Sequence, residues 1–89
     1  MGRTNSTYRN HLESFIDRFK PFRKALRKEE KKHLDSIWEK AHSRASAASY
    51  MNSSNPALPA IISVMIGMQK ELHENRKRIE ELEKMLEDR

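Results

Sequence analysis

The sequence predicts an all-α protein, a three-helix protomer whose long C-terminal helix forms an oligomeric coiled coil or helical bundle. Three observations predict this class. Apolar residues recur three and four residues apart along most of the chain, which is typical of one face of a helix. No segment alternates apolar and polar residues with the period of two that marks a half-buried strand. The last third keeps its apolar spacing for four heptads, as coiled coils do.

The first helix is predicted over residues 6–28. Pro21 lies within it and would remove one backbone hydrogen bond. The apolar spacing does not slip across Pro21, so we expect one kinked helix. The alternative is a break at Lys20, with Pro21 in the first turn of a new helix. The apolar stripe, whose aromatic residues we expect in the core, consists of Tyr8, Leu12, Phe15, Phe19, Phe22 and Leu26.

A turn is predicted within residues 27–32, which are polar on every side, and a second helix over residues 31–49. The second half of this helix is built from Ala and Ser, which permits close approach of another helix. Residues 50–55 are the clearest loop, because Asn and Ser precede Pro56. Residues 1–55 are therefore expected to form a helical hairpin with a basic N-terminal half. The inward positions of the second helix are Leu34, Ile37, Trp38, Ala41, Ala45 and Ala48.

The third helix is predicted over residues 56–87, within a segment 56–89 that ends in a coiled-coil tail. Asn55 or Ser54 can cap it, and prolines in its first turn cost little. Residues 1–89 make a single helical domain. Residues 58–68 are apolar on most faces, so we expect them inside the bundle. The predicted oligomer interface is the heptad seam, which consists of Leu58, Ile61, Met65, Met68, Leu72, Asn75, Ile79, Leu82 and Leu86.

The charges beside this seam favour a parallel dimer. With Leu58 at heptad position a, Glu71 lies opposite Arg76 of a second copy, and Arg78 lies opposite Glu83. Pairs of this kind set orientation more than stability. Asn75 falls at position d, where a buried polar residue can fix the register. The equal alternative is that Asn75 is a weak point where the coil meets solvent.

The basic charge of the chain is concentrated in its first half. Residues 1–50 hold 12 Lys and Arg against 6 Asp and Glu, whereas residues 51–89 hold 6 against 7. If the first helix continues, six cations stack in two columns on one face, four residues apart. Such a stripe could track phosphates, although charge runs on small helical proteins are more often solvated surface. The six cations are Arg23, Lys24, Arg27, Lys28, Lys31 and Lys32.

The sequence offers no pattern for catalysis, a cofactor, a metal or a small-molecule substrate. It has no cysteine, and its four histidines form no metal-binding motif. We find no nucleophile beside a base and no glycine loop that could cradle phosphates. No stretch reaches the roughly 18 apolar residues of a membrane span, and the N-terminus is polar. We expect a cytoplasmic protein that is not an enzyme and does not bind membranes.

Several short segments carry a resemblance to a known family. They are Met1-Gly2-Arg3-Thr4, Thr7-Tyr8-Arg9, residues 22–27, Trp38-Glu39-Lys40-Ala41, Ala47-Ala48-Ser49-Tyr50 and the C-terminal heptads. On these segments the chain resembles a family of small archaeal helical proteins of unknown function. The resemblance covers nearly the whole chain. It implies a source and a fold and brings no established activity.

The sequence therefore favours a non-enzymatic interaction or scaffold protein that associates with itself, most simply as a homodimer. Its specific role and any further protein partner are not encoded in a recognisable motif. The alternative is a nucleic-acid-binding protein that uses the basic N-terminal half. Such binding would be weak and independent of sequence, because no recognition helix presents side chains to base edges.

Overall fold

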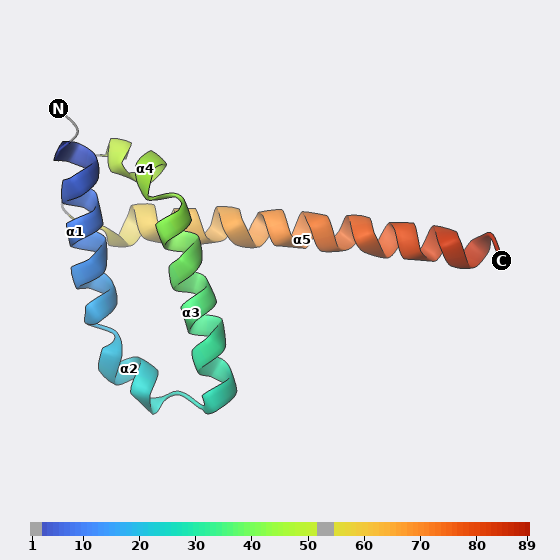
Figure 1. Cartoon of the computed structure of the whole chain (residues 1–89), viewed down its shortest axis with the longest axis horizontal. Coiled ribbons are helices and arrows are strands. Elements are labelled where there is room, and N and C mark those ends of the chain that lie inside the picture. The colour runs from blue at the N-terminus through green and yellow to red at the C-terminus, as the bar shows by residue number, and fades with distance from the viewer. Residues whose placement is uncertain (1–2, 52–54) are drawn as a thin grey trace.

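The computed structural model describes residues 3–51 and 55–89, and side chains from Tyr8 onward. Every element within those residues is helical, and the long C-terminal helix is present, so the predicted all-α class is confirmed, whereas the expected three helices are divided into five (Figure 1). The elements are α1 (Arg3–Asp17), α2 (Lys20–Ala25), α3 (Lys28–Ser43), α4 (Ala45–Ala48), the 3-10 turn η1 (Ser49–Met51) and α5 (Ala57–Glu87).

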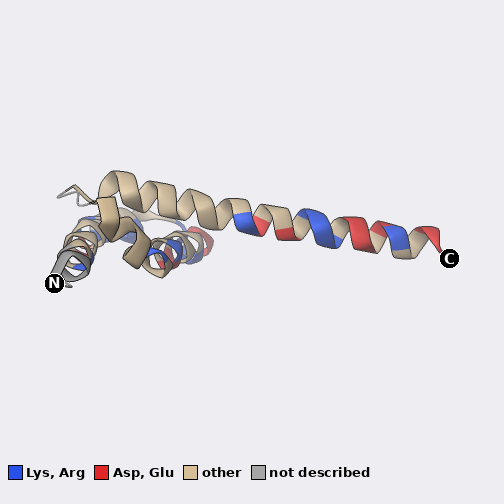
Figure 2. Cartoon of the chain, turned by 90° about the horizontal axis from the view of Figure 1, so that it is seen from above, with Lys and Arg blue, Asp and Glu red and all other residues tan. Residues whose placement is uncertain are grey.

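The helices form two layers. α1 and α3 lie side by side in one layer and are joined at one end by α2 (Figure 1). α5 crosses them in the other layer, contacts α1, α3 and α4 with its first half, and then projects beyond them (Figures 1 and 2). The molecule measures 56 × 36 × 16 Å because of this projection. None of the helices in the described part of the chain is long and apolar enough to cross a bilayer.

The expectation of one kinked helix over residues 6–28 is wrong. α1 ends at Asp17, a turn follows at Arg18 and Phe19, and α2 starts at Lys20. Pro21 lies in the first turn of α2, where the helix needs no N–H donor from it. The alternative that places a new helix at this proline is therefore the correct one.

The expected turn within residues 27–32 is shorter than predicted. Only Leu26 and Arg27 leave the helical conformation, with ψ values of 157° and 155°. α3 begins at Lys28, and the backbone N–H of Arg27 donates to the carboxylate of Glu30 at 3.1 Å. Acidic residues in a first turn also stabilise a helix by their favourable interaction with the helix dipole. Charged residues thus start the helix here rather than interrupt it.

The expected second helix over residues 31–49 is also divided. α3 ends at Ser43, and Arg44 breaks the helix with φ −116° and ψ 21°. α4 and η1 then turn over α1 and α5. Asn55 accepts a hydrogen bond from the N–H of Ala57 at 3.1 Å and so caps α5 as expected. Ser54, the other candidate cap, and the loop residues 52 and 53 lie outside the described residues.

The core is small and rich in alanine, which lets the helices approach closely. Phe15, Ile16 and Val64 pack against it and stay partly exposed. Leu34, Ile37 and Trp38 are likewise only partly buried. The buried apolar residues are Tyr8, Leu12, Ala41, Ala45, Ala48 and Ala60.

Aromatic rings extend this core along α1, α2 and α3. Phe19 meets Phe15, Phe22 and Trp38 edge to face, with ring centroids 5.2 to 5.8 Å apart. Such pairs contribute about 0.5–1.5 kcal/mol each beyond their area. Phe22 lies at the end of the row and is 53% exposed, so its predicted place in the core is wrong. α2 leaves the line of α1, which carries Phe22 away from the other layer.

Candidate functional site: the exposed face of the long helix

The inner face of α5 carries small residues and packs against the protein's own first half. Pro59, Ala60, Ser63 and Gly67 are buried there. The hydroxyl of Ser63 donates to the carbonyl of Pro59 at 2.8 Å, so this buried donor is satisfied within the helix. Small side chains at intervals of three and four residues let α5 lie close to α3 and α4.

Gly67 lies against the side chains of Lys40 and Arg44. A Cβ atom at this position would lie 2.8 Å from Cδ of Lys40 and 3.2 Å from Nη1 of Arg44. One turn later, Nζ of Lys40 forms an ion pair with Glu71 at 3.1 Å. Beyond Glu71, no described contact holds α5 to the rest of the protomer.

The outer face of α5 carries the large apolar residues of the seam. Met65 follows buried Ser63 by two residues, which is about 200° around a helix at 3.6 residues per turn. The seam therefore lies opposite the packed face. Its eight apolar side chains are 53% to 66% exposed, and Asn75 is exposed among them.

The expectation that residues 58–68 are buried all round is wrong within one protomer. The small residues of this segment are buried, while its large residues face outward. Ile62 and Ile66 widen the exposed apolar face, with 46% and 52% of their surface accessible. This half of α5 carries no Lys, Arg, Asp or Glu, and charges begin only in the projecting half (Figure 2).

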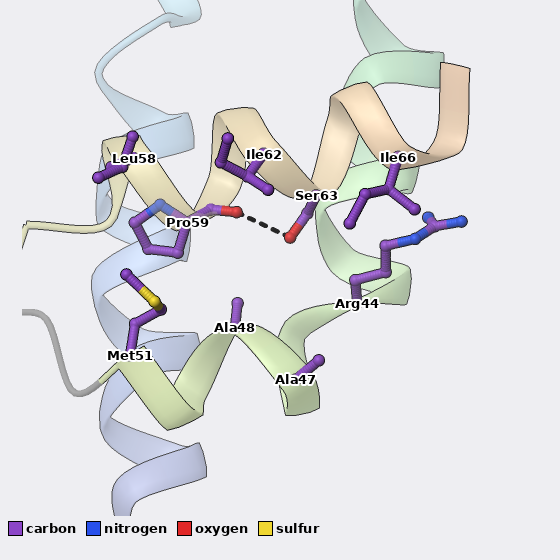
Figure 3. A pocket seen from close by; sticks show the side chains of 9 residues that line it. All are labelled: Arg44, Ala47, Ala48, Met51, Leu58, Pro59, Ile62, Ser63 and Ile66. Carbon is purple, nitrogen blue, oxygen red and sulfur yellow. Dashed lines mark hydrogen bonds between the residues drawn. The ribbon is translucent and has the colours of Figure 1, made fainter. Parts of the chain in front are cut away.

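Two apolar grooves flank the packed part of α5. The α4 groove has a volume of about 350 Å³ and is lined by Arg44, Ala47, Ala48, Met51, Leu58, Pro59, Ile62, Ser63 and Ile66 (Figure 3). The aromatic groove, on the opposite flank, has a volume of about 250 Å³ and is lined by Phe15, Phe19, Ile37, Trp38, Ala60, Ile61, Val64 and Met65. Both grooves are open toward the seam, since seam residues form part of each lining.

The family model described as a domain of unknown function (DUF8156) matches residues 1–89. The chain belongs to this family. Comparison with curated proteins and with solved structures finds no match. The family carries no stated activity, so the exposed seam and grooves of this DUF8156 member are the basis for any functional argument.

The predicted basic stripe does not form as two columns on one helix, because the chain turns at Leu26 and Arg27. Arg23 and Lys24 lie on α2, Arg27 lies at the turn, and Lys28, Lys31 and Lys32 lie on α3. The six cations instead surround the corner between the two helices.

Arg23 is engaged within the protomer at this corner. Its Nε and Nη2 donate to the two carboxylate oxygens of Asp35 at 2.9 and 2.8 Å. These hydrogen bonds lower the pKa of the Asp35 carboxyl and raise the pKa of the guanidinium. The pair holds α2 against α3. Because Asp35 offsets the charge of Arg23, this residue adds little to the positive charge available to a phosphate.

Outside this corner, the ring of His42 contacts two oxygen atoms of the protomer. Nε2 of His42 lies 2.7 Å from a carboxylate oxygen of Glu13, and its Nδ1 lies 3.0 Å from the carbonyl of Trp38. Because Glu13 lies on α1 and His42 on α3, this contact links the two helices. Within the described residues, no three His, Asp or Glu side chains gather as metal ligands would.

Sequence reasoning missed that the two faces of α5 differ, with small residues packed against the protomer and large apolar residues exposed. The signal was present, since Ala60, Ser63 and Gly67 recur at the three- and four-residue spacing of one helix face. A lone glycine inside a helical pattern also indicates close packing. Ile62 and Ile66 were missed because they lie outside the a and d positions.

Proposed function

We propose that this protein is a non-enzymatic interaction or scaffold protein that associates with itself as a parallel homodimer through the seam of α5. The observation that carries the proposal is the position of the seam. Its large apolar side chains are more than half exposed on the face of α5 that the chain's own helices leave uncovered. Extended apolar surfaces of this kind mark interaction sites. A helix with a heptad repeat packs against another helix with the same repeat, and a second copy of this chain supplies one.

The size of the apolar face supports association. Complete burial of a Leu, Ile or Met side chain contributes about 1.5–3 kcal/mol, so covering its exposed half contributes roughly 1 kcal/mol. Two sets of eight such side chains then contribute roughly 16 kcal/mol. Association itself costs about 4–15 kcal/mol. The projecting tail adds a further argument, because a helix gains most of its stability from tertiary packing that the protomer does not supply here.

The parallel orientation rests on charge and on Asn75. In a parallel pair, Arg78 faces Glu83 of the second copy, and neither residue forms an ion pair in the described protomer. Glu71 is already held by Lys40, so it contributes less to the orientation. Asn75 would lie opposite Asn75 of the second copy, and the two side-chain amides can hydrogen-bond to each other. An antiparallel pair would instead place the uncharged half of α5 against the charged tail.

Sedimentation equilibrium at micromolar concentration tests the proposal. The expected mass is twice the 10.5 kDa of one chain. Leu72→Asp should return the protein to one chain, because it places a charge in the middle of the seam. Lys70→Asp is the matched control on the face of α5 opposite the seam and should leave the dimer intact. A wild-type protein that stays monomeric would contradict the proposal.

Weak nucleic-acid binding is the second candidate function. Its support is the corner between α2 and α3, where Lys24, Lys28, Lys31 and Lys32 have no ion pair among the described residues. Reversing Lys28, Lys31 and Lys32 to Glu should abolish binding and its salt dependence, since each phosphate contact contributes about 0.9 to the logarithmic salt slope on duplex DNA. No binding by the wild type at low salt would remove this candidate.

The archaeal source and the cytoplasmic location remain predictions from the sequence. If both predictions hold, the partners of such a scaffold would be proteins or nucleic acids in the cytoplasm of an archaeal cell. Recovery of bound partners from the native host, with the Leu72→Asp variant as control, would identify what the dimer presents its surfaces to.

A further inference from the structure

We infer that the aromatic groove is the seat for Ile62 of the second copy, so that each protomer grips its partner's helix with its own α1 and α3. The inference rests on the proposed function, because it requires the parallel pairing of α5. It extends the dimer contact from the seam to a groove that α1 and α3 supply together with α5.

Helix geometry brings Ile62 of the second copy to this groove. In a parallel pair, the flank of one helix that carries its g positions lies beside the flank of the other helix that carries its e positions. Val64 lies at position g and lines the aromatic groove, and Ile62 lies at position e. The groove therefore opens on the flank where Ile62 of the second copy is presented.

The level along the helix also agrees. The residues of α5 that line the groove are Ala60, Ile61, Val64 and Met65, whose midpoint falls between residues 62 and 63. In an in-register pair, equivalent residues of the two copies lie at the same height. The pairing of Arg78 with Glu83 favours this register, so the isoleucine arrives at the middle of the groove.

The chemistry of the groove suits an isoleucine side chain. Aromatic and aliphatic side chains make up its whole lining. Its volume of about 250 Å³ is open to solvent in the protomer. Ile62 is 46% exposed on its own protomer, so nearly half of its surface is free for a partner to cover. Two-fold symmetry would fill both grooves at once.

Trp38 provides a direct readout, because it is the one tryptophan of the chain and lies on α3. A coiled coil confined to the projecting half of α5 would leave its surroundings unchanged. Filling the aromatic groove would exclude water from the indole and shift its emission to shorter wavelength. We would therefore follow Trp38 emission and sedimentation in parallel over a dilution series from high to low micromolar concentration.

Two isoleucine variants form a matched pair. Ile62 and Ile66 have similar exposure and both line the α4 groove, but Ile66 lies at position b, away from the seam. Ile62→Asp should raise the dimer dissociation constant by roughly tenfold or more, since it places a carboxylate against apolar side chains, and should abolish the emission shift. Ile66→Asp should retain both the dimer and the shift.

The outcomes separate this inference from the proposed function. A dimer whose Trp38 emission does not change with association would overturn the groove inference and leave the seam dimer standing. Equal effects of the two variants would also overturn it, because the heptad position would then be irrelevant. A wild-type monomer at every concentration would overturn both.

Discussion

Replacing Ile79 and Leu82 with alanine should weaken the dimer without weakening the helix. Both residues belong to the projecting half of α5 and are 55% and 53% exposed in the protomer. Alanine has the highest helix propensity, so the change does not disfavour the helical monomer. Any loss of association then reports the loss of contacts across the seam.

The magnitude follows from the exposed carbon. Each substitution removes three methyl or methylene groups, worth about 0.8 kcal/mol each on full burial. About half of that surface is free for a partner to cover, so each side chain contributes roughly 1.2 kcal/mol to association. Four such side chains in the dimer give roughly 5 kcal/mol, or an increase of the dissociation constant by about three to four orders of magnitude.

The assay is sedimentation equilibrium over a concentration series, with circular dichroism to follow helix content. Lys77→Ala with Lys84→Ala is the matched control, because these residues lie on neighbouring turns of α5, on the face opposite the seam. The control should associate like the wild type. Equal dissociation constants for the seam variant and the wild type would refute the reasoning, since the exposed seam would then contribute nothing to assembly.

Three further predictions concern the protomer. Tyr8 is 3% exposed and its hydroxyl has no partner among the described residues, so Tyr8→Phe should stabilise the protein by about 1 kcal/mol in urea denaturation; a clear loss of stability would show that the hydroxyl is bonded. Asp35→Asn should lower stability at neutral pH. Because Arg23 lowers the pKa of Asp35, the ion pair stabilises the fold above the unfolded value of about 4, and the difference between variant and wild type should vanish as pH falls through the lowered pKa. A difference that persists in acid would contradict this. Gly67→Leu should cost about 1–3 kcal/mol, since the side chain of Lys40 must move away, and a neutral result would show that this side chain moves freely.

The sequence was sufficient for the helical class, the long C-terminal helix and the exposed apolar seam as a pattern. The period of the apolar residues determines these features, and it continues for the whole length of α5. Asn55 was also identifiable as a cap, because an amide oxygen before a proline-led helix is a common start signal.

The breaks within the first half could not be placed from the period alone. The apolar spacing runs through Pro21 without a slip, yet the chain leaves the helix at Arg18 and Phe19. The alanine-rich segment is divided at Arg44, where no glycine or proline marks a break. Tertiary contacts accompany both breaks, since α2 contacts α3, whereas α4 and η1 pack on α1, where Tyr8 and Leu12 are buried.

The aromatic groove could not be predicted because it joins residues from three helices. Phe15, Trp38 and Val64 each appear in the sequence as ordinary core positions. Only the crossing of α5 over α1 and α3 brings them to one open surface.

The most direct test of the account is the distance between two spin labels on the paired α5 helices. The chain has no cysteine, so Lys84→Cys provides one labelling site per protomer, on the face of α5 opposite the seam. A parallel, in-register pair predicts one distance of about 30 Å, from helix axes 8–10 Å apart and two outward labels. A distance beyond about 40 Å would show an antiparallel pair, at a rise of about 1.5 Å per residue, and the absence of any interspin distance at micromolar concentration would show that the seam is not an association surface.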